Sequence, residues 1–257
     1  MSLDGRKKVK EFLLQKAARE VLLRKADSKG LFDFGKFHDS YKDEVQDSIS
    51  FTGQTHDFFT VVKVEALLEG VRRHLGNPGK LKFLDVGCGV GLTDQFLLDR
   101  AGTVHGIDIS GPVIRQAKKK NPKARYKVYN GKRMPFADGT FDVTFAICVL
   151  HHVPPSYYNG FVKEMSRVTK PGGLVALFEH NPLNPLTLRA VNTCVLDDEA
   201  ILLRRWKVGR LLERRCQELV EKRYILFTPF AWAPFRWLDR LLGWLPLGAQ
   251  YYVMARR

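Results

Sequence analysis

A glycine-rich segment and a later aspartate are the residues of this sequence whose types and spacing could do chemistry. Residues 84–91 read Leu-Asp-Val-Gly-Cys-Gly-Val-Gly after an apolar run, which predicts a buried strand ending in a glycine turn. Glycine has no Cβ, so the turn can bend tightly and lie close to a ligand. Asp108 ends the next apolar run, 103–109, where a carboxylate can accept hydrogen bonds from both ribose hydroxyls. Together they predict a site for a nucleoside cofactor.

The glycine spacing distinguishes between cofactors. A dinucleotide fingerprint reads G-x-G-x-x-G and wraps around a pyrophosphate. Here the pattern is G-x-G-x-G, and Leu92 stands where the third dinucleotide glycine would be. Asp85, just before the turn, would repel a pyrophosphate but can face an ammonium group. The pattern therefore favours S-adenosylmethionine, which has a ribose and an amino-acid end but no phosphate. The alternative is a strand–turn–helix whose glycines serve packing alone.

Residues 80–180 resemble the class I S-adenosylmethionine-dependent methyltransferases, in particular the type 11 group that includes quinone and sterol C-methyltransferases. The blocks that carry the resemblance are residues 84–91, GIDIS at 106–110, MPF at 134–136 with FD at 141–142, and RVTKPGG at 167–173. The resemblance implies an α/β fold with a doubly wound, mostly parallel seven-stranded sheet, an antiparallel last strand and an N-terminal helical cap.

The resemblance also implies a set of cofactor-binding residues. Asp85 would orient the ammonium group, and the backbone of Gly87 and Gly89 would lie along the methionine part. Asp108 would hold the ribose, and Ile109 would pack on the adenine. The full set comprises Asp85, Gly87, Cys88, Gly89, Asp108, Ile109, Asn130, Gly131, Ala146 and Ile147.

One position of this set departs from the family pattern. The family often has an acidic residue after the third strand, which accepts a hydrogen bond from the adenine amino group. This sequence has Asn130, followed by Gly131. An asparagine can still accept through its carbonyl oxygen. At the end of the fourth strand, the backbone of Ala146 and Ile147 should pass beneath the methionine part, although core packing explains Ile147 equally well.

Three residues at predicted strand ends are candidates for catalysis. Methyl transfer from a sulfonium requires alignment and an acceptor that loses its proton, and histidine suits that task near neutral pH. His151 follows the fourth strand, and His180 follows the fifth, with Glu179 beside it. His152 is a neighbour of the same kind, and one histidine of the pair could only brace the next helix. His38, His56, His74 and His105 are expected at the surface or in turns, with His56 the candidate exception in a lid.

Two segments bear on the acceptor. Residues 34–63 hold aromatic residues beside a glycine turn, which predicts a lid, although a plain helical cap is the alternative. The two Asn-Pro pairs at 181–185 predict an extended loop, in which Asn181 and Asn184 could present amides to a polar substrate. Asn184 could equally cap the next helix. These segments resemble methyltransferases of bacterial polysaccharide and glycolipid gene clusters.

The combined expectation is methyl transfer to a small or lipid-linked polar acceptor, most simply a sugar hydroxyl. An RNA or quinone-type methyltransferase is the alternative within enzymes. A silent protein that only binds S-adenosylmethionine is the alternative from another class, and the presence of both Asp85 and Asp108 argues against loss of the cofactor. A nicotinamide dehydrogenase is disfavoured by Leu92 and Asp85. The four cysteines form no C-x-x-C pair, so they are expected to be reduced, and no metal site is expected.

Charge leaves two partners open. The formal net charge is +15, and residues 111–133 contain nine Lys or Arg and no acid. Such a face attracts RNA or anionic lipid, although a solvated surface explains it equally well, and no aromatic stacking platform favours nucleic acid. The aromatic segment 226–237 could contact a membrane, although burial is favoured. No signal peptide or long apolar span is expected, which predicts a cytoplasmic protein with peripheral membrane contact at most. The sequence does not indicate an oligomeric state.

Apolar periodicity predicts how these residues are positioned. Residues 1–79 should form the helical cap or lid, with one helix at 6–26, and residues 80–257 a single cofactor-binding domain. Strands are predicted near 81–86, 103–109, 124–129, 141–148, 173–179, 223–228 and 249–255. Helical patterns are predicted at 92–98, 185–204, 207–220 and 234–243. Alternation of this kind places a ligand at the carboxyl ends of parallel strands.

Overall fold

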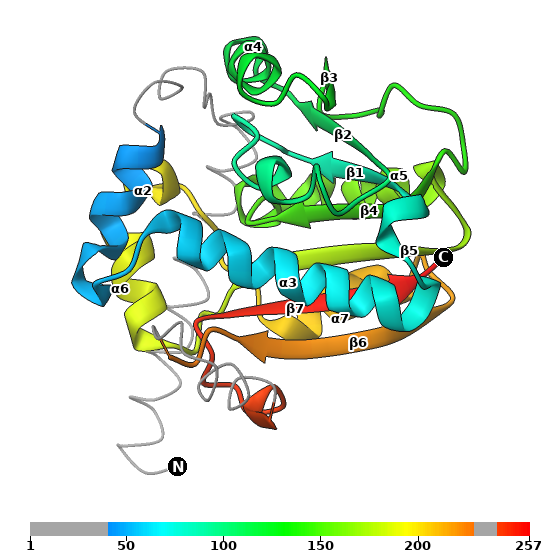
Figure 1. Cartoon of the computed structure of the whole chain (residues 1–257). Helices are drawn as coiled ribbons and strands as arrows, with labels where there is room; N and C mark the ends of the chain where they lie inside the picture. The colour runs from blue at the N-terminus through cyan, green and yellow to red at the C-terminus, as the bar shows by residue number, and fades with distance from the viewer. Residues whose placement is uncertain (1–40, 229–240) are drawn as a thin grey trace, which may run out of the picture.

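A seven-stranded sheet is the centre of the structure, a computed structural model that describes residues 41–228 and 241–257. Its strands, in the order β3-β2-β1-β4-β5-β7-β6, are shown in Figure 1. The bounds are β1 (Lys82–Val86), β2 (Thr103–Asp108), β3 (Arg125–Val128), β4 (Phe141–Ile147), β5 (Thr169–His180), β6 (Glu218–Ile225) and β7 (Gln250–Arg256). The strands β3, β2, β1, β4 and β5 are parallel, and β7 is antiparallel to both neighbours, β5 and β6. The predicted fold, with its antiparallel last strand, is confirmed.

Helices cover both faces of the sheet. They are α2 (Tyr41–Ile49), α3 (His56–Leu75), α4 (Gly111–Lys120), α5 (Tyr158–Val168), α6 (Pro185–Thr193) and α7 (Arg205–Glu213). Successive strand side chains point to opposite faces, so Phe83 packs with Leu67 and Leu68 of α3, whereas Leu84 packs with Val162 of α5. The core thus has two halves, one under α3 and one under α5 and α7.

The helix α3 illustrates how local signals set an element's bounds. The Thr55 side chain accepts a hydrogen bond from the Phe58 backbone amide, which caps the first turn. At the other end Gly76 has φ 86°, and Asn77-Pro78 follows, where the sequence predicts a stop. Residues 6–26, predicted as a further cap helix, lie outside the described residues.

Three predicted helices differ from the structure. Residues 92–98 form turns around a short 3-10 helix, Asp94–Phe96, instead of a regular helix. The helix predicted at 185–204 ends at Thr193 and is followed by a separate 3-10 helix, Val195–Asp197. The helix predicted at 207–220 ends at Glu213, and β6 begins at Glu218. Most of the helix predicted at 234–243 lies outside the described residues.

The strand β6 starts earlier than predicted, at Glu218 instead of near residue 223, and it ends at Ile225. Glu221 is buried, although a glutamate in a run of charges suggests a solvated helix face. Its carboxylate is paired with Arg73 and His74 of α3 and accepts a 2.8 Å hydrogen bond from the Tyr252 hydroxyl of β7. These partners come from segments far away in the sequence, so local periodicity cannot reveal them.

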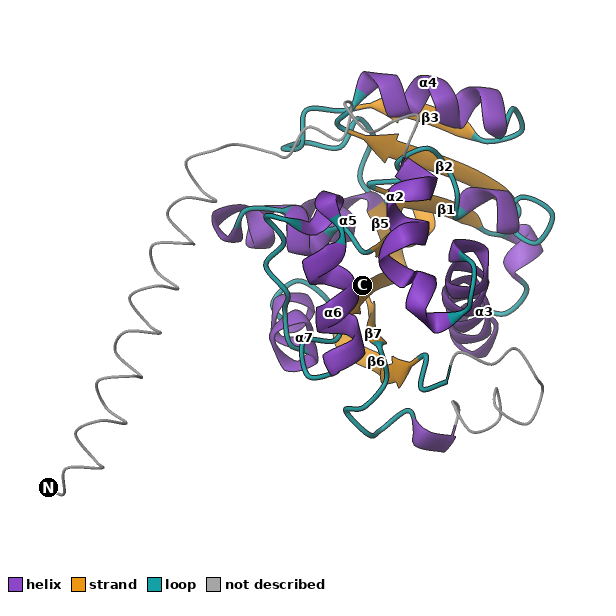
Figure 2. Ribbon diagram, turned by 90° about the vertical axis from the view of Figure 1, so that its left-hand side faces the viewer, coloured by secondary structure: helices purple, strands orange, loops and turns teal. Residues whose placement is uncertain are grey.

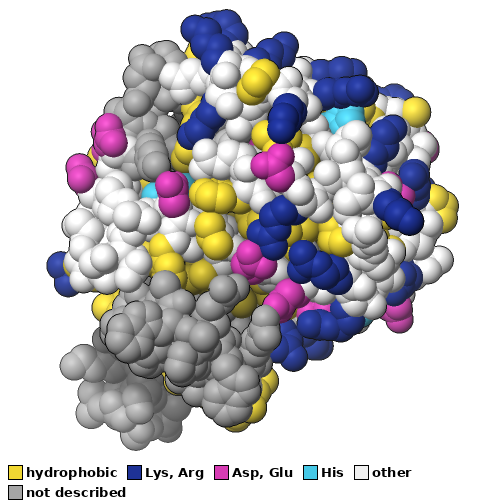
Figure 3. Space-filling view, viewed as in Figure 1, with side chains coloured by type: hydrophobic (Ala, Val, Ile, Leu, Met, Phe, Trp, Pro, Cys, Tyr) yellow, Lys and Arg dark blue, Asp and Glu magenta, His cyan; other side chains and the backbone are white. Residues whose placement is uncertain are grey.

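The parallel strands all end at one edge of the molecule, and α2 and α6 lie over that edge (Figure 2). Lys and Arg side chains gather on the surface around α4 and β3 in Figure 3. The exposed lysines at the end of α4, Lys118, Lys119 and Lys120, belong to the basic segment. The division of the chain at residues 79 and 80 stays a prediction.

Candidate cofactor and active site

A cavity of about 430 Å³ lies at the carboxyl ends of the strands. The glycine turn after β1, the ends of β4 and β5, and the helices α2, α3 and α6 contribute to its walls. The predicted site residues that line it are Asp85, Gly87, Cys88, Gly89, Ile147, His151 and His180. One cavity therefore joins the glycine turn to both predicted catalytic histidines.

The glycine turn is built for close approach. Gly87, Gly89 and Gly91 all have positive φ, at 80°, 52° and 76°. A Cβ on Gly87 would meet Val149 Cγ1 at 2.7 Å, and one on Gly91 would meet Asn121 Nδ2 at 2.5 Å. Gly89 differs, because nothing lies within 4 Å of its Cβ position. The space beside Gly89 is therefore open to a ligand.

Asp108 fixes the turn from the end of β2. Its Oδ2 accepts a hydrogen bond from the Gly89 amide at 3.0 Å, and its Oδ1 accepts one from the Ser110 amide at 2.9 Å. Burial raises the pKa of Asp108, although these backbone amides lower it. Asp108, Ile109, Asn130, Gly131 and Ala146 do not line the cavity. Their predicted roles toward the cofactor stay predictions.

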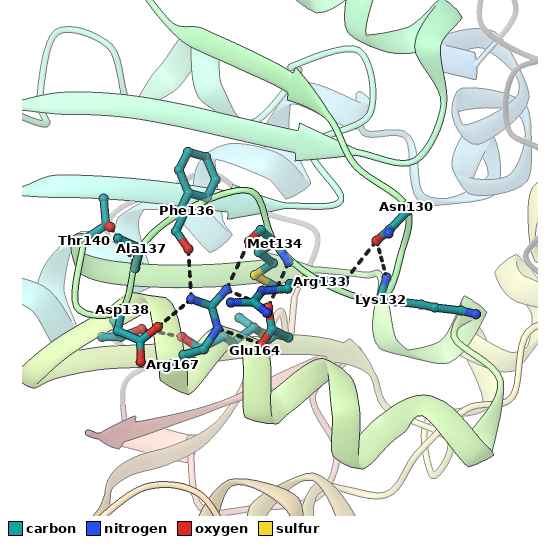
Figure 4. Close-up of polar contacts among 12 residues, drawn as sticks. Asn130, Lys132, Arg133, Met134, Phe136, Ala137, Asp138, Thr140, Glu164 and Arg167 are labelled. Atoms are coloured by element: carbon teal, nitrogen blue, oxygen red, sulfur yellow. Dashed lines mark hydrogen bonds and ion pairs between the residues drawn. The ribbon is translucent and has the colours of Figure 1, made fainter.

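Asn130 is held within its own loop. Its Oδ1 accepts hydrogen bonds from the backbone amides of Lys132 and Arg133, each at 3.0 Å (Figure 4). Gly131, between them, has φ 73°. Because both lone pairs of the carbonyl oxygen have a donor, the oxygen that was expected to accept from adenine already has partners.

Arg167 anchors the next part of that loop (Figure 4). Its guanidinium donates to both Glu164 carboxylate oxygens at 2.7 Å and to Asp138 Oδ1 at 2.7 Å. It also donates to the carbonyl oxygens of Phe136 and Met134 at 2.8 and 3.0 Å. Two motifs singled out in the sequence, residues 134–136 and 167–173, are thus joined by one side chain.

A buried carboxyl pair lies beneath the turn. Asp85 and Asp94 are buried and close enough to interact electrostatically, and Tyr126 donates its hydroxyl to Asp94 Oδ2 at 2.7 Å. Asn121 in turn donates to the Tyr126 oxygen at 3.0 Å. Burial, with the charges of Asp94 and Asp108, holds the pKa of Asp85 well above its ordinary value, and burial raises that of Asp94 to about 7. Asp94 was missed in the sequence, where its one signal is an acid among apolar residues.

His151 is clamped between two carboxylates. Its Nδ1 lies 2.5 Å from Glu179 Oε2, and the other Glu179 oxygen accepts from the Leu150 amide at 2.8 Å. On the opposite side, Asp197 Oδ1 lies 3.5 Å from His151 Nε2 and 3.3 Å from His152 Nε2. Glu179 is fully buried behind His151, so the structure places this predicted catalytic residue as a support for the imidazole. Asp197 was missed because it lies 46 residues further along the chain, in a segment predicted to be helical.

The surrounding charges shift the pKa values of His151 and His152 in opposite directions. Burial lowers the pKa of His151, but Glu179 and Asp197 raise it more, so that it lies well above its ordinary value. Burial and the neighbouring His151 lower the pKa of His152 to about 4. Although burial alone would raise it, both histidines hold the pKa of Asp197 far below its ordinary value.

Cys148 and His180 form a second titratable pair. Cys148 has φ 57°, a left-handed conformation that is uncommon outside glycine, and it lies directly after β4. Its Sγ is 4.0 Å from Lys63 Nζ and 3.6 Å from Gln250 Nε2, and Gln250 Nε2 is 3.3 Å from His180 Nδ1. Burial raises the pKa of the thiol, but Lys63 and His180 lower it to about 7. Burial lowers the pKa of His180, whereas Cys148 raises it, and the net direction is upward.

Residues 84–177 match the sequence profile of the methyltransferase domain family. They are a methyltransferase domain. The match supports a class I S-adenosylmethionine-dependent methyltransferase domain, with S-adenosylmethionine as its cofactor.

Curated relatives are similar to part of the chain. An uncharacterized methyltransferase of Synechocystis is 35% identical over 109 residues, which are 42% of this chain and 51% of that protein. Squalene methyltransferase 1 of Botryococcus braunii is 34% identical over 143 residues, 51% of this chain and 37% of that protein. A demethylmenaquinone methyltransferase of Beutenbergia cavernae is 34% identical over 110 residues, 42% and 45% of the two chains. The chain thus spans about half or less of the length of these relatives.

Solved structures share the fold of the methyltransferase domain. Geranyl diphosphate C-methyltransferase from Streptomyces coelicolor aligns with a TM-score of 0.55 at 17% identity, covering 75% of this chain and 78% of that one. A Haloferax volcanii methyltransferase complex with the activator Trm112 aligns with a TM-score of 0.60 at 15% identity, covering 88% and 99%. No described helix is long and apolar enough to cross a bilayer.

Part of the segment 34–63, predicted as a lid, forms part of the cavity wall. Phe51, His56 and Phe59 of this segment line the cavity, and closure of the segment over a ligand stays a prediction. The guanidinium of Arg189 in α6 lies 4.6 Å from the centre of the Phe51 ring, which joins the lid to α6 by a cation–π contact.

The Asn-Pro loop has a structural role. Asn181 is buried, donates to the carbonyl oxygens of Pro246 and Gly248 at 3.0 and 2.8 Å, and accepts from the Leu183 amide at 3.1 Å. The expectation that it presents an amide to the substrate is therefore wrong, because the side chain is already used within the fold. Asn184 accepts from the Thr187 amide at 3.0 Å and so caps α6, as the alternative interpretation has it.

His105 also differs from its expected surface position. It is buried on β2 with its ring 5.2 Å from that of Phe141, in an edge-to-face contact. Burial and the positive charge of Arg125 lower its pKa to about 4. Its position on a strand that alternates under α5 explains the burial, which a single histidine among apolar residues does not indicate.

Proposed function

We propose that the protein transfers a methyl group from S-adenosylmethionine to a small or lipid-linked polar acceptor, with a sugar hydroxyl as the acceptor group. The observation that carries the proposal is the single cavity, which brings the glycine turn within the same walls as Cys148, His151 and His180. A methyl donor at the turn and an acceptor at the histidines would thus share one enclosed space.

The residues of the turn fit the cofactor. The open space at Gly89 admits a ligand against the backbone, and Asp85, buried at the cavity wall, offers a carboxylate to an ammonium group. Asp108 holds the turn and lies where a ribose would contact it. When bound, S-adenosylmethionine supplies an electrophilic methyl group on a sulfonium.

Cys148 and His180 supply a proton acceptor. With its pKa lowered to about 7, the Cys148 thiol is partly ionised at neutral pH, and Gln250 and Lys63 stabilise the thiolate. An acceptor hydroxyl bound beside this pair would lose its proton to it. S-adenosylmethionine, when bound, would supply the methyl group that the oxygen receives and would leave as S-adenosylhomocysteine. His180, beside the thiolate, can carry the proton away toward solvent.

Carbon methylation is a second candidate, and one feature of the cavity favours it. Part of the wall is apolar, with Phe51, Phe59, Leu186, Leu196 and Phe227 among its residues. A flat or isoprenoid acceptor would suit that wall, and the relatives include methyltransferases named for squalene and demethylmenaquinone. Because Asn181 and Asn184 are engaged within the fold, the loop no longer argues against this candidate.

Calorimetric titration with S-adenosylhomocysteine tests the cofactor, with NAD as the control. S-adenosylhomocysteine should bind with micromolar affinity, and NAD should not bind. If neither compound binds, the enzyme proposal is contradicted. Methyl-labelled S-adenosylmethionine, offered with a lipid-linked glycan and with a prenylated hydroquinone, then tests the acceptor. Label on a glycan oxygen supports the main proposal, and label on ring carbon supports the second candidate.

Substitution of Cys148 tests the proton acceptor. Cys148→Ser should lower kcat by about 10²–10⁴-fold, because a serine hydroxyl does not ionise near neutral pH. Affinity for S-adenosylhomocysteine should be retained, since the thiol acts on the acceptor. Cys216→Ser is the matched control, because Cys216 packs among α5 and α7 away from the cavity lining. Full activity in Cys148→Ser would show that another group takes the proton.

A further inference from the structure

Two short 3-10 helices bring three metal-ligand side chains together. His151 and His152 belong to Leu150–His152 after β4, and Asp197 ends Val195–Asp197. The Ile201 amide donates to the His151 carbonyl oxygen at 2.9 Å, which ties the two segments together. A nitrogen of each ring and one Asp197 oxygen all lie within 4.8 Å of one another. We propose that His151, His152 and Asp197 bind a divalent transition-metal ion of the zinc class in the wall of the cavity.

The distances match a tetrahedral site. Zinc binds histidine nitrogen and carboxylate oxygen at about 2.0–2.2 Å, so two ligands of a tetrahedron lie roughly 3.4 Å apart. The Asp197 Oδ1 atom is 3.5 Å from His151 Nε2 and 3.3 Å from His152 Nε2. These separations are long for hydrogen bonds, but they match the distances between two ligand atoms of a tetrahedral site.

A supporting carboxylate is already in place. Metal-binding histidines almost always donate their other ring N–H to a carboxylate or carbonyl, which fixes the tautomer. Glu179 Oε2 is 2.5 Å from His151 Nδ1, and Glu179 is itself held by the Leu150 amide. With the proton on Nδ1, the Nε2 lone pair of His151 is directed at Asp197. That Nε2 atom is buried and makes no hydrogen bond.

The charges around His151 favour a cation. Two carboxylates, Glu179 and Asp197, lie on opposite sides of a buried imidazole. Glu179 is fully buried and Asp197 is partly buried, and negative charges removed from water in this way need positive charge between them. A second proton on the imidazole would supply one unit of positive charge. A divalent ion would supply two units and would be bound by the ring nitrogens of both histidines and by the Asp197 oxygen. The ring of His180, 5.1 Å from that of His151, lies beside this cluster.

The open side of the site faces the cavity. His151, His152 and Asp197 all line it, and a catalytic metal site keeps a position for water or substrate beside its three protein ligands. An oxygen of the acceptor bound there would lose its proton more easily, because the metal polarises it. This role rests on the proposed function: it implies an acceptor with a hydroxyl or other oxygen donor at its reacting end.

Metal titration of the untagged, chelator-treated full chain tests the proposal. We expect Zn²⁺ to bind at one site per chain by calorimetry, and Co²⁺ to give the visible spectrum of a tetrahedral site. The cobalt spectrum should lack the charge-transfer band of a thiolate, which excludes the four cysteines as ligands. Asp197→Asn should weaken Zn²⁺ binding at least tenfold, and Glu179→Gln should weaken it about 10–100-fold. Asp198→Asn, at the exposed neighbouring carboxylate, is the matched control.

Binding of S-adenosylhomocysteine, measured on the same samples, separates this inference from the proposed function. It should be the same with and without metal. If the wild type binds S-adenosylhomocysteine but not Zn²⁺, or if Asp197→Asn binds Zn²⁺ as the wild type does, the metal site is disproved while the methyltransferase proposal stands. If Asp197→Asn does not fold, His152→Gln carries the same test, because the His152 side chain is more exposed than that of the other histidine ligand, His151.

Discussion

At the scale of single residues, the Asp85–Asp94 pair carries a consequence that neither aspartate has alone. Each acid binds its proton more tightly because the two lie together in the core. Cys88 beside them also has a raised pKa, because of burial and these acids. An incoming ammonium group would offset the charge of the ionised pair, and cofactor binding should therefore release a proton.

We predict opposite pH dependences for stability and for binding. A carboxyl whose pKa is raised on folding stabilises the fold at low pH, and this contribution is lost as the pH rises through the folded value. Without ligand, the protein should thus lose stability as the pH rises from about 4, the ordinary range of a carboxyl group, to about 7, where Asp94 titrates. Affinity for S-adenosylhomocysteine should rise over the same range, by up to about tenfold per pH unit.

Asp94→Asn should flatten both profiles while keeping an acceptor for the Tyr126 hydroxyl. Thermal unfolding and calorimetry across this pH range measure the two effects. Asp99→Asn is the control, because Asp99 is exposed and pairs only with Lys123 at the surface. Unchanged profiles in Asp94→Asn would place the titrating group elsewhere.

The sequence alone identifies some of the interacting residues of the site but not their partners. Asp85 and Asp108 follow from the glycine turn, and His151, His180 and Glu179 from strand ends, because local spacing carries that information. Asp94, Asp197 and Lys63 could not be found, since their importance depends on which distant side chains they touch. Cys148 is visible as a cysteine, but its lowered pKa comes from Lys63 and His180.

At the scale of elements, the sequence predicts the parallel strands closely, because each buried strand is a compact apolar run between turn signals. It is less accurate at β6, where the strand is predicted but its first residues, from Glu218, are not. There the buried Glu221 is paired with Arg73, His74 and Tyr252, which are distant in the sequence. The loop 129–140 is a related case. Its shape depends on Arg167 in α5, which supplies five hydrogen bonds to it and to Glu164.

Arg167→Met tests this anchoring. The change keeps much of the side-chain volume but leaves Glu164 and two carbonyl oxygens without their donor, so the free energy of unfolding should fall by about 2–4 kcal/mol. Denaturant unfolding measures it. Arg72→Met, at an exposed position of α3, is the control and should change stability little. A change below about 0.5 kcal/mol in Arg167→Met would contradict the anchoring role.

At the scale of the whole molecule, the net charge of +15 is the most distinctive property. Part of it is concentrated on α4, where Lys118, Lys119 and Lys120 are exposed. Most of the aromatic segment 226–237 lies outside the described residues, but Leu241, Trp244 and Leu247 near it are exposed and apolar. Exposed tryptophan and leucine on a basic protein suit an anionic membrane surface.

We predict binding to anionic vesicles that weakens with salt. Each lysine near such a surface contributes about 1 kcal/mol, so a Lys118, Lys119 and Lys120 to Gln variant should bind roughly 100-fold more weakly if α4 faces the lipid. Vesicle sedimentation at low and high ionic strength measures this, with neutral phosphatidylcholine vesicles as control. If vesicle binding changes neither with salt nor with the substitutions, the basic residues form only a solvated surface. If RNA displaces the protein from the vesicles, a nucleic-acid partner is favoured instead.

The position of β7 has a consequence for how the protein is made. This strand, residues 250–256, lies between β5 and β6, so every pairing that joins β6 to the rest of the sheet passes through it. During synthesis, β1 to β5 can assemble early, but β6 has no partner until residues 250–256 leave the ribosome. Until then two strand edges stay open, and such edges pair readily with other chains. The interval before β7 inserts is therefore when the nascent chain most needs a chaperone.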